Sequence, residues 1–253
     1  MRRLLTLVLL LTAVPAAAQD LAVLSGGSSR GTLTELAQTF QRQSGHAVAV
    51  TFDTTPGINR RLGAGESPDV LVAATAVIDE AIRSGRAIAD TRLSLGRVGS
   101  AVGISRGDPK PDVSTVDALK AALMKAEHVL ITQGASGTSA LKMLEGMGIL
   151  AAVKPKIVEV ESGAALAERL GTTRGELGLG YISELIYGES KGGGTLVALL
   201  PRALQSYAAY DAVVMTSATQ PQLARDFVRT LASPEARKSL VANGWEPGDV
   251  RAQ

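Results

Sequence analysis

Small hydroxyl residues recur in this chain at points where a short apolar run gives way to an amphipathic segment. Ser28 and Thr55 follow the first two apolar runs, and Ser136 and Ser162 follow two later ones. A hydroxyl is a neutral hydrogen-bond donor, and the first turn of a helix adds free backbone N–H groups and a dipole that favours negative charge. This combination suits the capture of a small anion.

Helix capping is the ordinary alternative for these residues. Serine and threonine are favoured N-caps, because their side-chain oxygen accepts a hydrogen bond from an amide of the first turn. Glycines at the same points, such as Gly27, Gly134 and Gly163, would let the backbone approach a ligand without a Cβ in the way. Four such junctions make an anion site as good an explanation as capping, and both stay open at this stage.

Apolar or β-branched runs alternate with amphipathic stretches along the whole chain, which predicts an α/β fold with largely parallel sheets. Leu33, Leu36 and Phe40, for example, recur with the spacing of one buried helix face, and Gly45 suits the end of that helix. The predicted strands are 21–25, 47–52, 69–73, 102–104, 129–132, 156–160, 177–180 and 208–215. The hydroxyl junctions then fall at the carboxyl ends of strands, where open α/β sheets bind ligands.

The chain is expected to divide into two lobes. The segments near 96–103 and 201–209 are predicted to cross between the lobes, and the C-terminal helices are predicted to return to the first. Lobe 1 then comprises 19–97 plus 209–253, and lobe 2 comprises 98–208 including the hinge crossings. A single continuous domain is the alternative, because about 235 residues are enough for either arrangement.

The first 18 residues have the pattern of an export signal. Arg2 and Arg3 precede an apolar run, 4–14, and Ala16 to Ala18 provide the small residues that a signal peptidase accepts, so cleavage is expected after Ala18. The run is shorter than the roughly 20 apolar residues that span a bilayer. The mature protein is therefore expected in the periplasm, with no membrane insertion after cleavage.

Charge and composition exclude several classes of partner and chemistry. The chain has 26 basic and 24 acidic residues, and loss of Arg2 and Arg3 would leave 24 against 24. A near-neutral protein has no basic surplus for nucleic acid or a membrane surface. The chain has no cysteine, which excludes disulfides, thiol catalysis and a lipid-modified Cys.

Familiar catalytic and cofactor motifs are absent from the sequence. The glycines between Gly26 and Gly31 are not followed by Lys and Ser or Thr, so they form no nucleotide-binding P-loop. His46 and His128 are the only histidines, too few for a conventional zinc site, and no serine stands in a nucleophile elbow. We expect no catalytic residue, no metal and no cofactor. The glycines 192–194 are expected to form an exposed turn.

Taken in order, several segments resemble the periplasmic molybdate-binding proteins of bacterial ABC transporters over almost the whole mature length. No single segment is diagnostic, but the series in this order is fairly specific. The segments are Leu-Ala-Val-Leu-Ser (21–25), Gly-His-Ala-Val-Ala-Val-Thr-Phe (45–52), Ala-Gly-Glu-Ser-Pro-Asp-Val-Leu-Val-Ala-Ala (64–74), Gly-Ile-Ser-Arg-Gly-Asp-Pro (103–109), Ala-Ser-Gly-Thr (135–138) and Leu-Gly-Leu-Gly-Tyr (177–181).

This resemblance implies a two-lobed, hinge-closing fold of the type II periplasmic-binding-protein kind. It implies a monomer that captures a small oxyanion, molybdate or tungstate, and delivers it to an ABC permease in the inner membrane. In the family, neutral groups of both lobes hold the anion. The matching positions are Ser28 and Thr55 for two hydroxyls, Ser136 and Gly163 for two backbone amides, and Tyr181 for a tyrosine hydroxyl.

Three charged residues near the junctions depart from that neutral pattern. Arg30, Arg60 and Asp53 stand beside the first two junctions. Arginines that point inward would suit a carboxylate ligand, whereas arginines on solvated helix faces would have no part in binding. Exported relatives of this fold also include an aconitate isomerase, so an organic-acid binding protein or an isomerase of that kind is the alternative reading.

Overall fold

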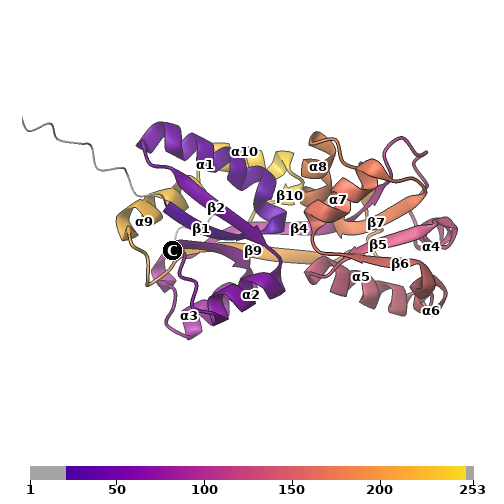
Figure 1. Cartoon of the computed structure of the whole chain (residues 1–253), viewed down its shortest axis with the longest axis horizontal. Coiled ribbons are helices and arrows are strands. Elements are labelled where there is room, and N and C mark those ends of the chain that lie inside the picture. Colours follow the sequence, from indigo (N-terminus) through magenta and orange to yellow (C-terminus); the bar gives the residue numbers. More distant parts are fainter. Residues whose placement is uncertain (1–20, 249–253) are drawn as a thin grey trace, which may run out of the picture.

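The computed structural model describes residues 21–248. The expected signal and its cleavage point after Ala18 lie outside these residues. Figure 1 shows the described chain as two groups of helices and strands that lie side by side along the long axis. A mixed sheet passes through both groups in the order β2-β1-β3-β9-β4-β7-β5-β6. Within residues 21–248, no helix has the length and apolar character needed to cross a membrane.

The first group is built on three parallel strands, with β1 between β2 and β3. As the spacing of its apolar residues predicts, α1 buries Leu33, Leu36 and Phe40, and the Phe40 ring packs edge-on against that of Phe227, with centroids 5.3 Å apart. Gly45 ends α1 with a φ of 77°. The elements are β1 (Leu21–Gly26), η1 (Gly27–Ser29), α1 (Arg30–Ser44), β2 (Val48–Asp53), α2 (Thr55–Gly63), β3 (Val70–Ala74), α3 (Thr75–Arg83), η2 (Ala89–Thr91), α9 (Pro221–Thr230), α10 (Pro234–Ala242) and β10 (Trp245–Glu246).

The second group repeats this plan with β5 between β6 and β7, all parallel. Its apolar core is separate from that of the first group and includes Leu119, Leu144 and Leu177. The elements are α4 (Val116–Lys125), β5 (His128–Thr132), α5 (Ala135–Gly146), α6 (Leu150–Val153), η3 (Lys154–Lys156), β6 (Ile157–Val160), α7 (Gly163–Thr172), β7 (Glu176–Tyr181), α8 (Ile182–Ser190) and β8 (Thr195–Leu199).

Two long strands, β4 (Leu93–Ile104) and β9 (Tyr207–Val214), join the groups (Figure 1). They pair with each other from Leu93 opposite Ala212 to Gly99 opposite Tyr207, and the rest of β4 pairs with β7 and β8. The expected lobe boundaries, at 97/98 and 208/209, fall inside these two paired strands. The expected crossing at 96–103 therefore lies wholly in β4, whereas the one at 201–209 is a loop up to residue 206 and enters β9 at Tyr207.

The structure differs from the sequence-based expectation in three respects. The outer strands are parallel as expected, but β4 and β9 run antiparallel to their neighbours, because they carry the chain out of one group and back. The sequence analysis did not predict α8 or β8. The turn at 192–194 was expected to be exposed, but Gly193 and Gly194 are buried against α7, where a Cβ on Gly193 would meet the backbone of Ala167.

Candidate functional site

A cavity of about 250 Å³ lies between the two groups, where strands β1, β2, β5, β6 and β7 end. A helix follows each of these strands closely, so residues at the N-termini of η1–α1, α2, α5, α7 and α8 all border the cavity. The first N–H groups of a helix have no partner inside that helix, and its dipole favours a negative charge there. Five convergent N-termini suit this cavity to an anion.

Ser28 is positioned by the turn between β1 and α1. The Ser29 hydroxyl donates to the carbonyl of Gly26 at 2.8 Å and lies 2.5 Å from the Ser25 hydroxyl. These bonds use the neighbouring hydroxyls inside the turn, whereas Ser28, also buried, lines the cavity. The Tyr210 hydroxyl, from β9, donates to Ser28 Oγ at 3.4 Å. Ser28 is therefore held by Tyr210, and both residues line the cavity.

Two adjacent threonines at the start of α2 have different roles, because one caps the helix and the other has a hydroxyl without a capping role. Thr54 is the N-cap, and its Oγ1 accepts a hydrogen bond from the Gly57 amide at 3.3 Å. Thr55 is the first helical residue and has no capping role, and both threonines line the cavity. The capping explanation therefore applies to Thr54, and Thr55 can donate to a ligand.

The turn between β5 and α5 borders the cavity from the second group. Thr132 Oγ1 accepts hydrogen bonds from the amides of Gly134 and Gly137, each at 3.2 Å, and lies 2.7 Å from Ser136 Oγ. The Ser136 hydroxyl is thus engaged with Thr132. The group that Ser136 can still offer is its amide in the first turn of α5, as the family resemblance implies.

Gly163 begins α7 directly after the N-cap, Ser162. The Ser162 hydroxyl accepts a hydrogen bond from the Ala165 amide at 3.2 Å, so it acts as a cap. Gly163 borders the cavity and carries one of the free amides of the first turn. A Cβ at this position would overlap the carboxyl group of Glu184. This position therefore requires glycine for as long as Glu184 points into the cavity.

Glu184, in the first turn of α8, is a cavity residue that the sequence analysis did not single out. Its Oε1 accepts a hydrogen bond from Ser28 Oγ at 3.4 Å, across the gap between the groups. Its Oε2 is buried and has no hydrogen-bond partner among the described residues. A Cβ added to Gly27 would lie 3.3 Å from Oε1, so glycines of both groups make room for this carboxyl.

Burial raises the pKa of Glu184 to about 7. A hydrogen bond from the Tyr181 backbone amide, the Ser28 hydrogen bond and the positive charge of Arg30 lower this pKa, in decreasing order, but do not cancel the effect of burial. Burial and the charge of Glu184 raise the pKa of Tyr181 to about 12, and burial raises that of Tyr210 as well. Both tyrosines are therefore neutral hydroxyl donors, while Glu184 changes its charge near neutral pH.

The remaining charges at the cavity are few. Arg30 is the only basic side chain among the described residues that line it, and its guanidinium lies 4.2 Å from the centroid of the Phe52 ring. Asp53 accepts a hydrogen bond from Arg61 Nε at 2.8 Å. Although partial burial raises the pKa of Asp53, that bond and one from the Thr54 amide lower it below its usual value. Asp53 is thus a paired carboxylate.

The structure brings the residues implied by the family resemblance to one cavity: Ser28, Thr55, Ser136, Gly163 and Tyr181. Arg30 joins them, whereas Arg60 is exposed on α2 and does not line the cavity. Contact between these residues and a ligand stays a prediction.

Sequence reasoning missed Glu184 and Tyr210. A signal for Glu184 was present, because Ile182, Leu185 and Ile186 have helical spacing directly after Tyr181 and put Glu184 in a first turn. Nothing in the sequence says that this carboxyl faces Ser28, since that contact depends on how the two groups meet.

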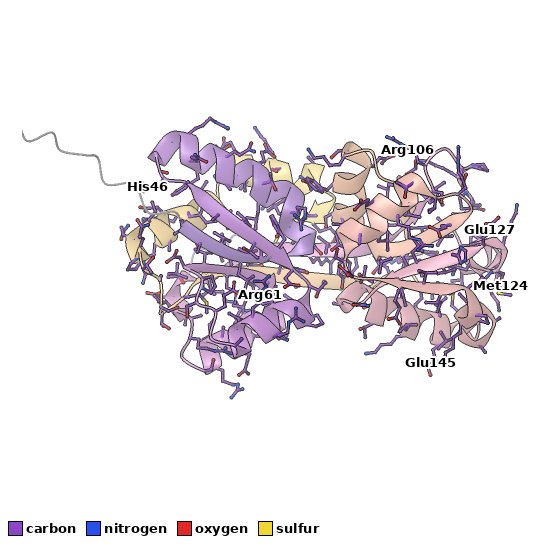
Figure 2. All side chains as sticks on the ribbon, in the orientation of Figure 1. His46, Arg61, Arg106, Met124, Glu127 and Glu145 are labelled. Atoms are coloured by element: carbon purple, nitrogen blue, oxygen red, sulfur yellow. The ribbon has the colours of Figure 1, made fainter. Side chains whose placement is uncertain are left out.

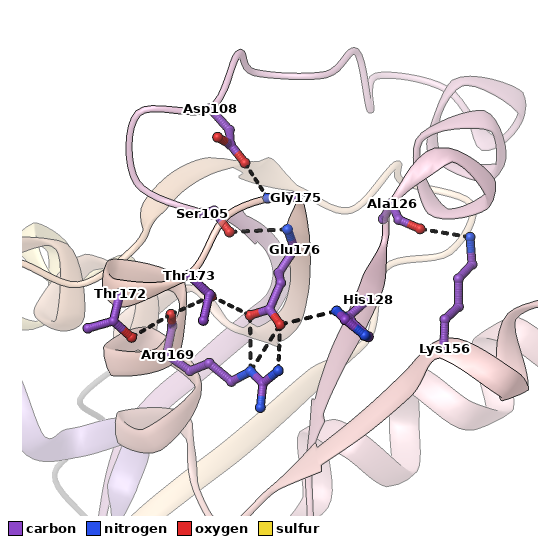
Figure 3. A network of polar contacts seen from close by, with 10 residues as sticks. All are labelled: Ser105, Asp108, Ala126, His128, Lys156, Arg169, Thr172, Thr173, Gly175 and Glu176. Carbon is purple, nitrogen blue, oxygen red and sulfur yellow. Dashed lines mark hydrogen bonds and ion pairs between the residues drawn. The ribbon is translucent and has the colours of Figure 1, made fainter.

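The two histidines lie away from the cavity. Figure 2 shows His46 at the outer end of the first group. His128 lies in the second group, with its Nδ1 3.4 Å from Glu176 Oε1 in the network of Figure 3. Within residues 21–248, no group of three or more His, Cys, Asp or Glu side chains is placed to hold a metal ion.

Comparison with known proteins agrees with this fold. The family described as bacterial extracellular solute-binding protein matches residues 21–246. The chain is 31% identical over 238 residues to an aconitate isomerase from Pseudomonas sp, which covers 90% of this chain and 87% of that enzyme. It is 27% identical over 241 residues to the molybdate-binding protein ModA from Azotobacter vinelandii, with 93% of each chain covered.

Among solved structures, the periplasmic molybdate-binding protein from Azotobacter vinelandii is similar with a TM-score of 0.77. The match covers 91% of this chain and all of that protein, at 20% sequence identity. At that level of identity the likeness shows a shared fold, the mixed α/β architecture of periplasmic binding proteins.

Proposed function

The chain belongs to the bacterial extracellular solute-binding protein family, and from this premise we propose that it captures a small oxyanion, molybdate or tungstate, between two lobes for an ABC permease. The observation that carries the proposal is the convergence of five helix N-termini on one cavity. Neutral N–H and O–H donors compensate the charge of an anion without binding every anion through a net positive field.

Each lobe would contribute part of the anion shell. Ser28 and Thr55 would donate hydroxyls from lobe 1, and Ser136, Gly163 and Tyr181 would donate two amides and a hydroxyl from lobe 2. The lobes in this proposal are 19–97 with 209–253, and 98–208. Because the anion would contact both, it would stabilise the closed state relative to an open one, which is the differential affinity that a closing motion requires.

The setting of this function is an exported, monomeric protein. A signal cleaved after Ala18 would place the mature chain in the periplasm, where it would meet the permease of an inner-membrane importer. A near-neutral mature charge gives no reason to expect nucleic acid or a membrane surface as a partner.

The direct test is calorimetric titration of the purified protein with molybdate, tungstate, sulfate and citrate. Binding of molybdate or tungstate at micromolar affinity or tighter, about −8 kcal/mol or more negative, with none for citrate, is the expected result. Binding of citrate alone would replace the oxyanion by an organic acid. An absence of heat with all four anions would reject capture of these anions.

A second candidate function is isomerisation of an unsaturated tricarboxylic acid such as aconitate. The observation in its favour is Glu184, a half-buried side chain with a buried Oε2 that changes charge near pH 7 beside Arg30, together with the 31% identity to an aconitate isomerase. Ionised Glu184 would remove a proton from the methylene carbon next to a carboxylate, and the electron pair would shift the double bond. A proton would then add to the other end of the allylic system from the Glu184 carboxyl after exchange with solvent, so no oxidant or further reactant is needed.

This second function has its own test. Proton NMR of cis-aconitate in heavy water, with protein at high concentration, should show trans-aconitate and deuterium at the reacting carbon if the chain is an isomerase. Glu184→Gln should abolish both signals, because an amide cannot remove the proton. Wild-type protein that produces neither signal over many hours would end this candidate.

A further inference from the structure

The hydroxyl of Ser28 has two competing uses. It donates to Glu184 Oε1 at 3.4 Å while it accepts from the Tyr210 hydroxyl at 3.4 Å. A serine hydroxyl carries one proton, so Ser28 cannot donate to Glu184 and to a bound anion at the same time. An anion that accepts a hydrogen bond from the Ser28 hydroxyl must therefore displace Glu184 as the acceptor of that bond.

An ionised Glu184 would also oppose the anion by its charge. Its carboxyl lies in the wall of the same cavity, and its Oε2 is buried without a partner among residues 21–248. Two negative charges in one partly desolvated cavity repel each other strongly. A neutral carboxyl removes the repulsion, releases the Ser28 proton and offers the ligand an O–H donor of its own.

The groups that face Glu184 do not remove this conflict. Arg30, from α1, contributes one positive charge, and Tyr181 and Tyr210, from β7 and β9, are neutral donors. The α7 helix presents Gly163 to it, and η1 presents Gly27. The other titratable side chains in the cavity wall are Asp53, Glu161 and Tyr187. One arginine thus faces both Glu184 and any anion, which is too little positive charge for the two together.

We propose that Glu184 determines the specificity of this cavity by admitting an anion only together with one proton, which the carboxyl and the ligand then share. This inference rests on the proposed anion capture and adds the stoichiometry of the bound state. An anion without protons, such as molybdate, would bind with uptake of a proton by Glu184. An anion that brings its own acidic O–H would donate it to Oε2 and would need no uptake.

The proton coupling has a definite pH dependence. Burial raises the pKa of Glu184 in the ligand-free protein to about 7, so the carboxyl is already neutral below that pH. Molybdate should bind there with little proton uptake. Above it, each bound molybdate must bring one proton, so affinity should fall about tenfold for each pH unit. Without proton coupling, affinity would not change in this range.

The test is calorimetric titration of the full mature chain with molybdate at about pH 8 in two buffers of different ionisation enthalpy. We expect uptake of nearly one proton per molybdate in the wild type and nearly none in Glu184→Gln, whose affinity should also be the same at about pH 6 and about pH 8. Glu189→Gln is the matched control, because Glu189 is an exposed side chain of the same helix, α8, and does not line the cavity. This variant should keep the uptake.

The outcomes separate this inference from the proposed function. Molybdate binding that is independent of pH, with no proton uptake in the wild type, overturns the coupling and leaves anion capture intact. An absence of binding by molybdate, tungstate and citrate at every pH rejects capture itself, and the coupling with it. The buffer comparison needs only wild-type protein, so it decides the question even if Glu184→Gln does not fold.

Discussion

Ser28 and Glu184 are 156 residues apart in the chain, yet the Ser28 hydroxyl donates to the Glu184 carboxyl at 3.4 Å across the gap between the two groups of elements. The contact joins the turn after β1 to the first turn of α8, two elements that border the cavity from opposite sides. The same hydroxyl is the one that the family resemblance assigns to the anion. In the proposed function, anion binding and the protonation of Glu184 would thereby depend on a single atom, Ser28 Oγ.

Removal of either hydroxyl from the first group should weaken anion binding. Ser28→Ala and Thr55→Val should each lower molybdate affinity roughly tenfold to a hundredfold, because a hydrogen bond to a charged group contributes about 1.5–3 kcal/mol. Titration calorimetry at about pH 6, where proton uptake is small, measures the effect directly. Unchanged affinity in both variants would exclude these two hydroxyls from the site.

Thr54 provides the matched control for Thr55, because the two differ in role but not in chemistry. Thr54 caps α2, so Thr54→Ala should lower the free energy of unfolding by about 1 kcal/mol. Its effect on affinity should be smaller than that of Thr55→Val, which leaves the cap in place. The reverse pattern would mean that Thr54 is the ligand.

Gly163→Ala should displace the Glu184 carboxyl. An added Cβ overlaps that group, and the carboxyl must leave its place beside Ser28. At about pH 6 we expect molybdate affinity to fall at least tenfold, because the ligand loses the neutral carboxyl as a donor. The pH dependence of affinity between about pH 6 and about pH 8, measured by titration, should shrink. Gly146→Ala is the control, since a Cβ there meets nothing within 4 Å. Equal behaviour of the two variants would contradict the contact.

The two arginines of the alternative reading should behave differently. Arg30 lines the cavity, whereas Arg60 is exposed on α2. Arg30→Gln should weaken binding of whichever anion the protein takes by about tenfold or more, because it removes a charge-assisted donor, and Arg60→Gln should leave affinity within about twofold. If the ligand is a carboxylic acid, the loss at Arg30 should be larger for citrate than for molybdate. Equal losses in both variants would indicate long-range attraction instead of contact.

Away from the cavity, the second group contains a buried carboxylate, Glu176, that should contribute to its stability. Glu176 accepts hydrogen bonds from Arg169, at 2.6 Å for the shortest, and from Thr173 at 2.5 Å (Figure 3). Burial raises the pKa of Glu176, but these hydrogen bonds lower it by more, so that the net pKa is below the usual 4.5. A lowered folded-state pKa contributes stability that is present above about pH 4.5 and lost as the pH falls through the folded value.

Glu176→Gln should therefore lower the free energy of unfolding by about 2 kcal/mol at pH 7, less than a fully buried pair because Arg169 reaches solvent. Urea unfolding at about pH 7 and about pH 3 measures it, and the difference between wild type and variant should shrink at the lower pH. Molybdate affinity in the folded variant should not change. A loss of stability that is the same at both pH values would show that the charge of Glu176 is unimportant.

The sequence predicted the strand-to-helix junctions around the cavity because each has a local signal. A hydroxyl or glycine at the end of an apolar run identifies a strand-to-helix turn, and parallel strands bring such turns to one edge. Ser28, Thr55 and Gly163 each stand in such a turn. The expected lobe boundaries had no comparable signal, since β4 and β9 are paired with each other at both positions.

Glu184 shows why the rest of the site was not foreseen. Its surroundings come from residues distant in the chain, with Ser28 and Gly27 supplied by the opposite group. A first-turn glutamate is most often a solvated helix N-terminal residue, which the sequence alone cannot distinguish from a buried one. Only the approach of α8 to η1 turns it into a group of the cavity.

The ligand-free protein should itself report the burial of Glu184. Its pKa is raised from 4.5 to about 7 on folding, so the folded state binds this proton more tightly than the unfolded chain. The contribution of this proton to the free energy of unfolding is therefore complete below about pH 4.5, is lost as the pH rises to about 7, and does not change further above that value.

Glu184→Gln carries no charge at any pH and should not show this decline. Relative to wild type, it should gain about 3 kcal/mol in free energy of unfolding between pH 4 and pH 8. Urea unfolding at those two values, with Glu161→Gln as the exposed control, measures the gain. A difference between wild type and Glu184→Gln that stays constant with pH would mean that this carboxyl is solvated, and the proton-coupled site would lose its physical basis.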